Sequence, residues 1–171
     1  AYKDNVIEKI QEYIYDELKQ VYGGQIDYTK MISAVLMSVY NISGIPFVII
    51  IDEWDCVIRN GGNKTLVHSY LQFLHLLFKS EESKTFLALA YITGILPIKK
   101  IKDESALNNF REFTMLKSKQ LTRYFGFTED EVKKLCITYN MDFESIKAWY
   151  NVYLIYGLHM YNPNSVVQAM L

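Results

Sequence analysis

The chain has 171 residues, of which 50% are hydrophobic and 22% are charged, and its formal net charge is −1. This balance excludes a disordered chain, and the near-neutral charge provides no broad field that would attract nucleic acid or an anionic membrane. The two cysteines, Cys56 and Cys136, are too few for a disulfide-rich secreted scaffold. Because the longest apolar runs are far shorter than the ~20 residues that span a bilayer, we expect a soluble, cytoplasmic protein with no membrane partner.

Two helices are expected at the beginning of the chain. Apolar residues recur at helical spacing over residues 6–21, and Asp4 can cap this helix. A second helix should follow Asp27 as its cap. The Ser-Gly-Ile-Pro segment at 43–46 ends it, because glycine accepts the left-handed conformation and proline cannot continue the helix.

Two apolar segments predict buried strands on either side of a helix. Residues 47–51 are continuously apolar and rich in β-branched side chains, so we expect both faces of this strand to be covered. Residues 65–78 have the spacing of a helix with a broad apolar stripe, and 85–92 form the second apolar run. A strand, a helix and a strand of these lengths predict a βαβ unit and therefore a parallel sheet flanked by helices.

Shorter elements are expected after Pro97. Residues 106–110 can form a short helix and 113–116 a short strand, and from residue 119 onward we expect short helices to dominate. Three of these helices have start signals, at Thr128, Asp142 and Asn162. The chain begins and ends abruptly, so we expect it to be a fragment of a longer protein.

The most informative local pattern is the acidic end of the first strand. Asp52 and Glu53 follow the apolar run directly, which places two carboxylates at the C-terminal edge of a parallel sheet, where open α/β sheets bind their ligands. In a phosphate-handling site the first carboxylate can hold Mg²⁺, and the second can deprotonate a water. A strand that simply becomes polar where it meets solvent would have the same pattern, and this alternative stays open.

The segment Ile50–Asp55 resembles the "IDEYD" signature of the AAA-ATPase-like family of P-loop proteins, which is found mostly in bacteria. Five further segments resemble motifs of that family in the same order: 91–95 ("ITG"), 105–110 ("S-x-LNN"), 125–132 ("FGFT-EEE"), 149–150 ("WYDGY") and 161–165 ("YNPWS"). The resemblance covers residues 45–171. The chain departs from it at Asn151, Val152 and Asn164, which weakens any role carried over to the C-terminal segment.

The resemblance implies a fold and a division of the chain. Residues 1–118 would form a partial α/β core of the P-loop NTPase type, with its N-terminal strand and phosphate loop missing. Within it, 47–53 would be the Walker B strand and 85–93 a sensor-like strand. Residues 119–171 would form a helical, lid-like region that is truncated at its C-terminus.

The resemblance also implies an activity, in which the parent protein binds and hydrolyses ATP with Mg²⁺. Asp52 would hold the magnesium ion through water, Glu53 would be the catalytic base, and Thr93 would lie beside the γ-phosphate. Asp55 would help to position the nucleotide or would only pair with a neighbouring cation. Arg111, from the basic stretch between residues 99 and 123, is our candidate for an arginine that binds the phosphates.

A phosphate loop of the form G-x-x-x-x-G-K-[ST] does not occur in the sequence. The segment 61–65, Gly-Gly-Asn-Lys-Thr, has the wrong spacing, because Asn63 separates the glycine from Lys64. In the resembled family the phosphate loop lies N-terminal to everything in this chain. We therefore expect the fragment alone to bind nucleotide weakly and to be inactive.

Two other classes of function remain open. A degenerate, non-hydrolysing NTPase module that serves as an interaction or regulatory scaffold would have a similar sequence. A protein that acts on nucleic acid is the second alternative, since members of the family often carry a C-terminal nuclease-like domain and the basic stretch offers a phosphate-binding surface. A homo-oligomer is also compatible with the sequence.

Overall fold

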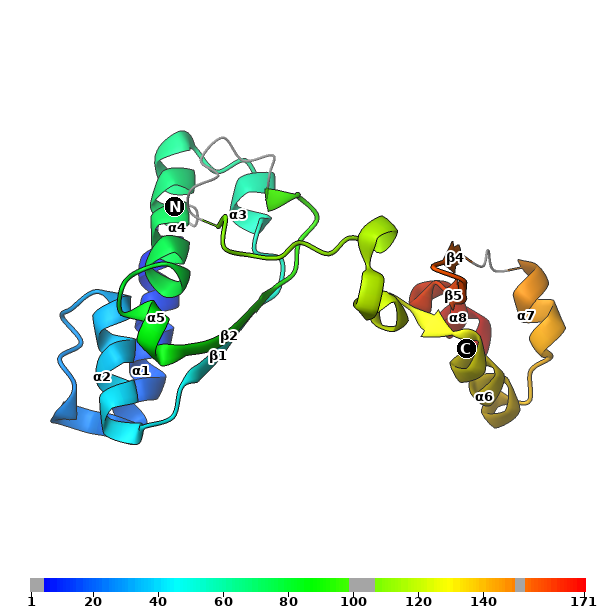
Figure 1. The fold of residues 1–171 in the computed structure, drawn as a ribbon, viewed down its shortest axis with the longest axis horizontal. Coiled ribbons are helices and arrows are strands. Elements are labelled where there is room, and N and C mark those ends of the chain that lie inside the picture. The colour runs from blue at the N-terminus through cyan, green and yellow to red at the C-terminus, as the bar shows by residue number, and fades with distance from the viewer. Residues whose placement is uncertain (1–4, 99–106, 150–152) are drawn as a thin grey trace. The chain divides into compact units, whose positions relative to one another are not determined.

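The computed structural model describes residues 5–98, 107–149 and 153–171. The chain forms two compact units, Ala1–Phe110 and Arg111–Leu171 (Figure 1). Each unit has a hydrophobic core of its own. The fold is mixed α/β, with helices and a small parallel sheet in the first unit, which confirms the predicted class at this level.

Three long helices form most of the first unit. They are α1 (Val6–Tyr22), α2 (Ile32–Ser43) and α4 (Lys64–Phe78), close to the predicted ranges. The predicted cap of α2 is wrong, because the helix begins after Met31. The Asp27 carboxylate instead accepts hydrogen bonds from the backbone N–H of Thr29, at 3.0 Å, and from its hydroxyl, at 2.6 Å, which stabilises a local turn before the helix.

The two strands of the first unit are parallel, as predicted. Strand β1 (Phe47–Ile51) pairs with β2 (Leu87–Ile92), and Ile51 lies opposite Ile92. A short helix, α5 (Ser83–Phe86), takes up the first two residues of the run predicted as the second strand, so that strand begins later than expected. Another short helix, α3 (Cys56–Arg59), follows β1 and was not predicted.

The prediction that both faces of the strands are covered is wrong for the part of the chain that the structure describes. Figure 1 shows α1, α2 and α4 on one side of the strands, and Ile49 and Ile51 pack into the core there. Four alternate side chains on the other face are 52–69% exposed: Val48, Ile50, Leu89 and Tyr91. A continuous apolar run shows that a face is hydrophobic, but it does not show which element covers that face.

The second unit contains a sheet that the sequence analysis missed. Strands β3 (Phe127–Thr128), β4 (Tyr153–Ile155) and β5 (Leu158–Tyr161) form an antiparallel sheet in the order β3-β5-β4. These strands have only two to four residues, which is too short for an alternating pattern to be recognised. The expectation that short helices dominate from residue 119 onward is confirmed, but it did not include this sheet.

The helices of the second unit follow their predicted start signals. Thr128 and Glu131 form the capping box of α6 (Glu129–Tyr139), Asp142 accepts a 2.8 Å hydrogen bond from the Ser145 N–H at the start of α7 (Phe143–Trp149), and Asn162 caps α8 (Pro163–Met170). These three predictions are confirmed.

Two predictions of short elements, both between β2 and α6, are wrong. Residues 107–110 form turns in place of a helix, and Ala106 lies outside the described residues. Residues 113–114 have no regular structure, and Met115–Lys117 and Lys119–Tyr124 are 3₁₀-helices. Over the described ranges, no helix is both long enough and apolar enough to cross a bilayer.

Candidate functional site

The candidate site lies where the carboxyl ends of β1 and β2 meet. Since Ile51 and Ile92 are paired, the residues that follow them emerge at the same edge of the sheet. The N–H of Thr93 donates to the carbonyl of Ile51 at 2.9 Å, and the N–H of Trp54 donates to the carbonyl of Thr93 at 2.9 Å. These backbone bonds tie the two strand ends to each other and determine which side chains become neighbours.

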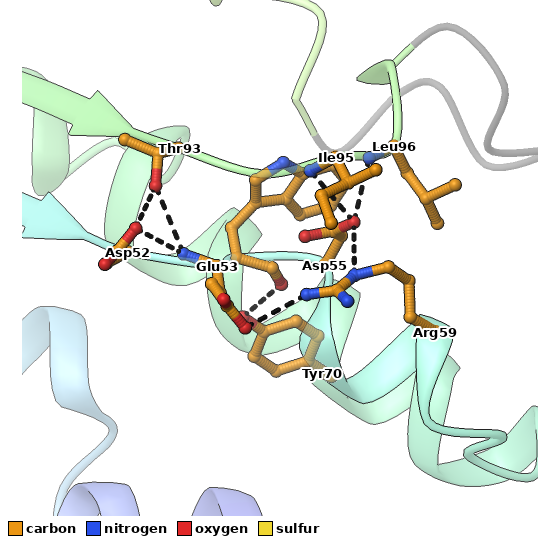
Figure 2. Close-up of polar contacts among 9 residues, drawn as sticks. Asp52, Glu53, Asp55, Arg59, Tyr70, Thr93, Ile95 and Leu96 are labelled. Atoms are coloured by element: carbon orange, nitrogen blue, oxygen red, sulfur yellow. Dashed lines mark hydrogen bonds and ion pairs between the residues drawn. The ribbon is translucent and has the colours of Figure 1, made fainter. Parts of the chain in front are cut away.

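Asp52 and Thr93 are brought into direct contact by this arrangement (Figure 2). The Thr93 hydroxyl donates a hydrogen bond to Oδ1 of Asp52. The backbone N–H of Glu53 lies 3.0 Å from the same Oδ1 and 3.2 Å from the Thr93 hydroxyl oxygen. The predicted magnesium-side carboxylate and the predicted sensor threonine therefore share one hydrogen-bonded group, although they are 41 residues apart in sequence.

Glu53 has a backbone conformation that is rare for a residue other than glycine, and its side chain does not point toward Thr93 as that of Asp52 does. Its φ is 50°, in the left-handed region that non-glycine residues rarely adopt. Its side chain is 65% exposed, and Oε2 accepts a hydrogen bond from Nη2 of Arg59 at 3.0 Å. Figure 2 shows the Glu53 carboxylate turned toward Arg59, whereas the Asp52 carboxylate is turned toward Thr93.

Asp55 is a buried, ionised carboxylate next to the site, and it holds two loops together. Its side chain is 0% exposed, and its Oδ2 accepts hydrogen bonds from the N–H groups of Leu96 (2.8 Å) and Ile95 (3.2 Å) and from Nε of Arg59 (2.9 Å). Burial acts to raise the pKa of this carboxyl, but the two amides and the guanidinium outweigh burial, so the pKa of Asp55 is lowered. The carboxylate therefore holds the loop that follows β2 against the turn that follows β1.

The loop that follows β2 passes so close to Trp54 that only glycine fits at position 94. A Cβ atom on Gly94 would lie 2.6 Å from Cδ1 of Trp54 and 2.7 Å from Oδ1 of Asp55. Trp54 is itself buried in the core of the first unit, and its carbonyl accepts a 2.7 Å hydrogen bond from the Tyr70 hydroxyl. Burial raises the pKa of Tyr70 well above its ordinary value, so its hydroxyl stays protonated and donates to Trp54. The strand-end turn is thus attached to helix α4.

The predicted site residues separate into two groups. Asp52, Glu53, Thr93 and Asp55 are neighbours in the first unit, as the sequence analysis expected of parallel strand ends. Arg111 belongs to the second unit, where its guanidinium lies 5.0 Å from the centre of the Phe113 ring, and its role at the phosphates stays a prediction.

Arg59 is the residue that the sequence analysis missed. It pairs with both Asp55 and Glu53. The available signal was the four-residue spacing between Asp55 and Arg59, which brings an acid and a base onto one face of a helix. This spacing points to a contact only if the residues are helical, and the sequence did not predict α3, the four-residue helix that follows Asp55 and ends at Arg59.

The oxygen ligands that Mg²⁺ prefers can be compared with the side chains at this site. Within the described ranges, no group of three or more His, Cys, Asp or Glu residues could hold a metal ion. Magnesium at nucleotide sites needs only one or two carboxylates, because phosphates and waters supply the remaining ligands. Asp52 is exposed and supplies one such carboxylate, next to a hydroxyl, so the residues present fit the ion.

Comparison with known proteins found no matching family model, no matching curated protein and no matching solved structure. The assignment of roles therefore depends on the contacts at the two strand ends and on the chemistry of the residues that make them.

Proposed function

We propose that the chain carries the Walker B half of a Mg²⁺–ATP site, in a P-loop ATPase of the AAA-ATPase-like type. The observation that supports this proposal best is the contact between Asp52 and Thr93 at the carboxyl edge of two parallel strands, with Glu53 as the next residue. That edge is where open parallel sheets bind their ligands. A strand that only became polar at the surface would not need an acid and a threonine from separate strands to share a hydrogen bond.

In the proposed site each residue has one task. Asp52 would hold Mg²⁺ through a water molecule, and the bound ion would supply positive charge for the phosphates. Thr93, whose hydroxyl already donates to Asp52, lies beside the γ-phosphate. Glu53 takes the proton from the attacking water. Asp55 holds together the loops that carry these residues.

The proposal places the phosphate loop in sequence that precedes Ala1. The test therefore uses the full-length protein, encoded by the complete reading frame that contains this chain. We expect this protein to hydrolyse ATP only with Mg²⁺. Glu53→Gln should lower turnover by about 10²- to 10⁴-fold, the usual contribution of a general base, and should leave nucleotide binding intact. Asp16→Asn, which changes an exposed carboxylate on α1, serves as the control and should leave turnover unchanged.

Three results would contradict the proposal. One is a reading frame without a phosphate loop upstream of Ala1, and another is unchanged turnover in Glu53→Gln. The third is a full-length protein whose thermal stability does not respond to ATP with Mg²⁺, which would favour the non-hydrolysing scaffold. If this protein instead bound DNA with a strong dependence on salt, the nucleic-acid alternative would be favoured.

A further inference from the structure

Basic side chains without acidic neighbours are concentrated in one short segment of the second unit. Residues 113–128 contain three cations and no Asp or Glu, whereas residues 129–149 contain three cations and five acids. The three cations of the first segment, which we call the basic strip, are Lys117, Lys119 and Arg123, and all of them are exposed. Among the described residues, no carboxylate lies within 4.0 Å of any of them. The protein itself therefore leaves the charge of the strip uncompensated.

Two aromatic rings follow the basic strip directly in sequence. Tyr124 is 82% exposed and Phe125 is 37% exposed. Neither ring packs on another aromatic ring in the part of the chain that the structure describes. A single exposed aromatic side chain is ordinary on a protein surface. Two consecutive exposed rings next to three unpaired cations are a more specific combination, because they offer a ligand both positive charge and flat apolar surface.

Buried hydroxyls hold the basic strip on the second unit. Ser118 and Thr122 lie between the cations in sequence, are 0% and 2% exposed, and have their hydroxyl oxygens 2.8 Å apart. The Thr122 hydroxyl also donates to the carbonyl of Lys119 at 2.6 Å. These residues belong to the two 3₁₀-helices and the junction between them, drawn in yellow-green before β3 in Figure 1, and β3 is paired with β5. The backbone that carries the strip is thus fixed before any ligand binds.

We propose that the second unit binds single-stranded nucleic acid, with the basic strip on the phosphates and with Tyr124 and Phe125 stacked on bases. Single strands are bound by positively charged surfaces that follow the backbone, together with aromatic side chains on which successive bases stack. A duplex keeps the faces of its bases inside, and an acidic protein segment has no bases, so neither ligand uses the two rings in this way. The inference goes beyond the proposed function and does not depend on it, because it involves none of the residues at the ends of β1 and β2. It includes no reaction on the nucleic acid.

The binding test measures the fluorescence anisotropy of labelled oligo(dT) and oligo(U) with the full-length protein, in the absence of ATP. Oligonucleotides of about 20 nucleotides are longer than the usual site of one small domain, and binding of either one supports the inference. The logarithm of the association constant should fall with the logarithm of the salt concentration with a slope of about −2, the value for three phosphate contacts on a single strand. The triple variant Lys117→Gln, Lys119→Gln, Arg123→Gln should lose most of this slope and should bind at least about ten-fold more weakly at low salt.

Matched variants elsewhere in the second unit serve as controls. The triple variant Lys133→Gln, Lys134→Gln, Lys147→Gln removes the same charge outside the strip and should keep the affinity within about two-fold. Tyr124→Ala should weaken binding of the single strands by about five-fold or more, the lower end of what one stacked base contributes, and should leave binding of a duplex unchanged. Tyr139→Ala removes another exposed tyrosine, at the end of α6, and should have no effect.

Four results would overturn the inference. The full-length protein could bind neither oligonucleotide, the two triple variants could lose affinity equally, or Tyr124→Ala could bind single strands as well as the wild type does. The fourth is displacement of the oligonucleotide by a poly-glutamate peptide at equal charge concentration, which would assign the strip to an acidic protein partner. ATP hydrolysis by the same variants keeps the two proposals apart. Absence of turnover with intact oligonucleotide binding overturns the proposed function alone, and normal turnover without oligonucleotide binding overturns this inference alone.

Discussion

Asp55→Ala is the substitution that tests the support beneath the site most directly. The side chain is fully buried, and its Oδ2 accepts the N–H groups of Leu96 and Ile95 at 2.8 and 3.2 Å. The alanine variant leaves these amides without their acceptor at a place where the carboxylate had excluded water. It also removes the anchor of Arg59.

The expected loss can be estimated from the two amide bonds. A hydrogen bond to a charged group contributes about 1.5–3 kcal/mol. The loop can relax and hydrate in the variant, so we take the lower limit for each bond and expect a loss of about 3 kcal/mol in the free energy of unfolding. Asp55→Asn keeps the shape and one acceptor but loses the charge, and it should lose about half as much.

The pH dependence of this effect has a defined sign. The folded protein lowers the pKa of Asp55, so the carboxylate stabilises the folded state above its unfolded pKa of about 3.9 and loses this effect as the pH falls through the lower folded pKa. The difference between wild type and Asp55→Asn should therefore be constant above about pH 5 and should shrink below about pH 4.

The assay is denaturant unfolding followed by the fluorescence of Trp54, which is buried beside Asp55 in the first unit. Trp149 is the other tryptophan of the chain, and a Trp149→Phe background removes its signal. Asp16→Asn is again the control, because this exposed carboxylate pairs with Lys19 on the surface of α1. A loss below about 1 kcal/mol in Asp55→Ala, similar to the control, would refute the view that Asp55 holds the loop.

Three further substitutions test other parts of the structure. Gly94→Ala should destabilise the first unit by about 1–3 kcal/mol in the same Trp54 assay, since its new methyl group would overlap Trp54; an unchanged midpoint would contradict the close approach. Ile50→Thr should change the free energy of unfolding by less than about 0.5 kcal/mol, because this side chain lies on the exposed face of β1; a loss above 2 kcal/mol would show that the face is covered. Thr128→Ala should remove about 1 kcal/mol from α6 by breaking its capping box, and hydrogen exchange of the amides in that helix should become about five-fold faster; unchanged exchange would show that the cap has no role.

Local sequence signals predicted the long helices and the two parallel strands. Helix α4 has a broad apolar stripe over its whole length, and the run at 47–51 has the β-branched composition of a strand. The capping signals at Thr128 and Asn162 also determined where helices begin, because a side chain two or three residues from the amides it binds acts within a single turn. These features depend on neighbours in sequence, and one sequence is enough to recognise them.

Short elements could not be predicted in this way. The strands of the second unit are two to four residues long. Strand β3 depends on the pairing of residues 127–128 with residues 160–161, which are far away in sequence, and β4 depends on the pairing of residues 153–155 with residues 158–160. The helix expected at 106–110 and the strand expected at 113–116 failed for the same reason, since a few residues of suitable propensity carry too little information without their packing partners.

For the candidate site, the sequence by itself determined the chemistry at the end of each strand: the acid pair Asp52 and Glu53 and the hydroxyl of Thr93. Only the tertiary structure decided how these groups are used, because hydrogen bonds across 40 residues depend on strand register. It placed Thr93 on Asp52, turned Glu53 toward Arg59 and buried Asp55 beneath them. The acid pair is adjacent in sequence, yet the Asp52 carboxylate faces Thr93 and the Glu53 carboxylate faces Arg59 (Figure 2).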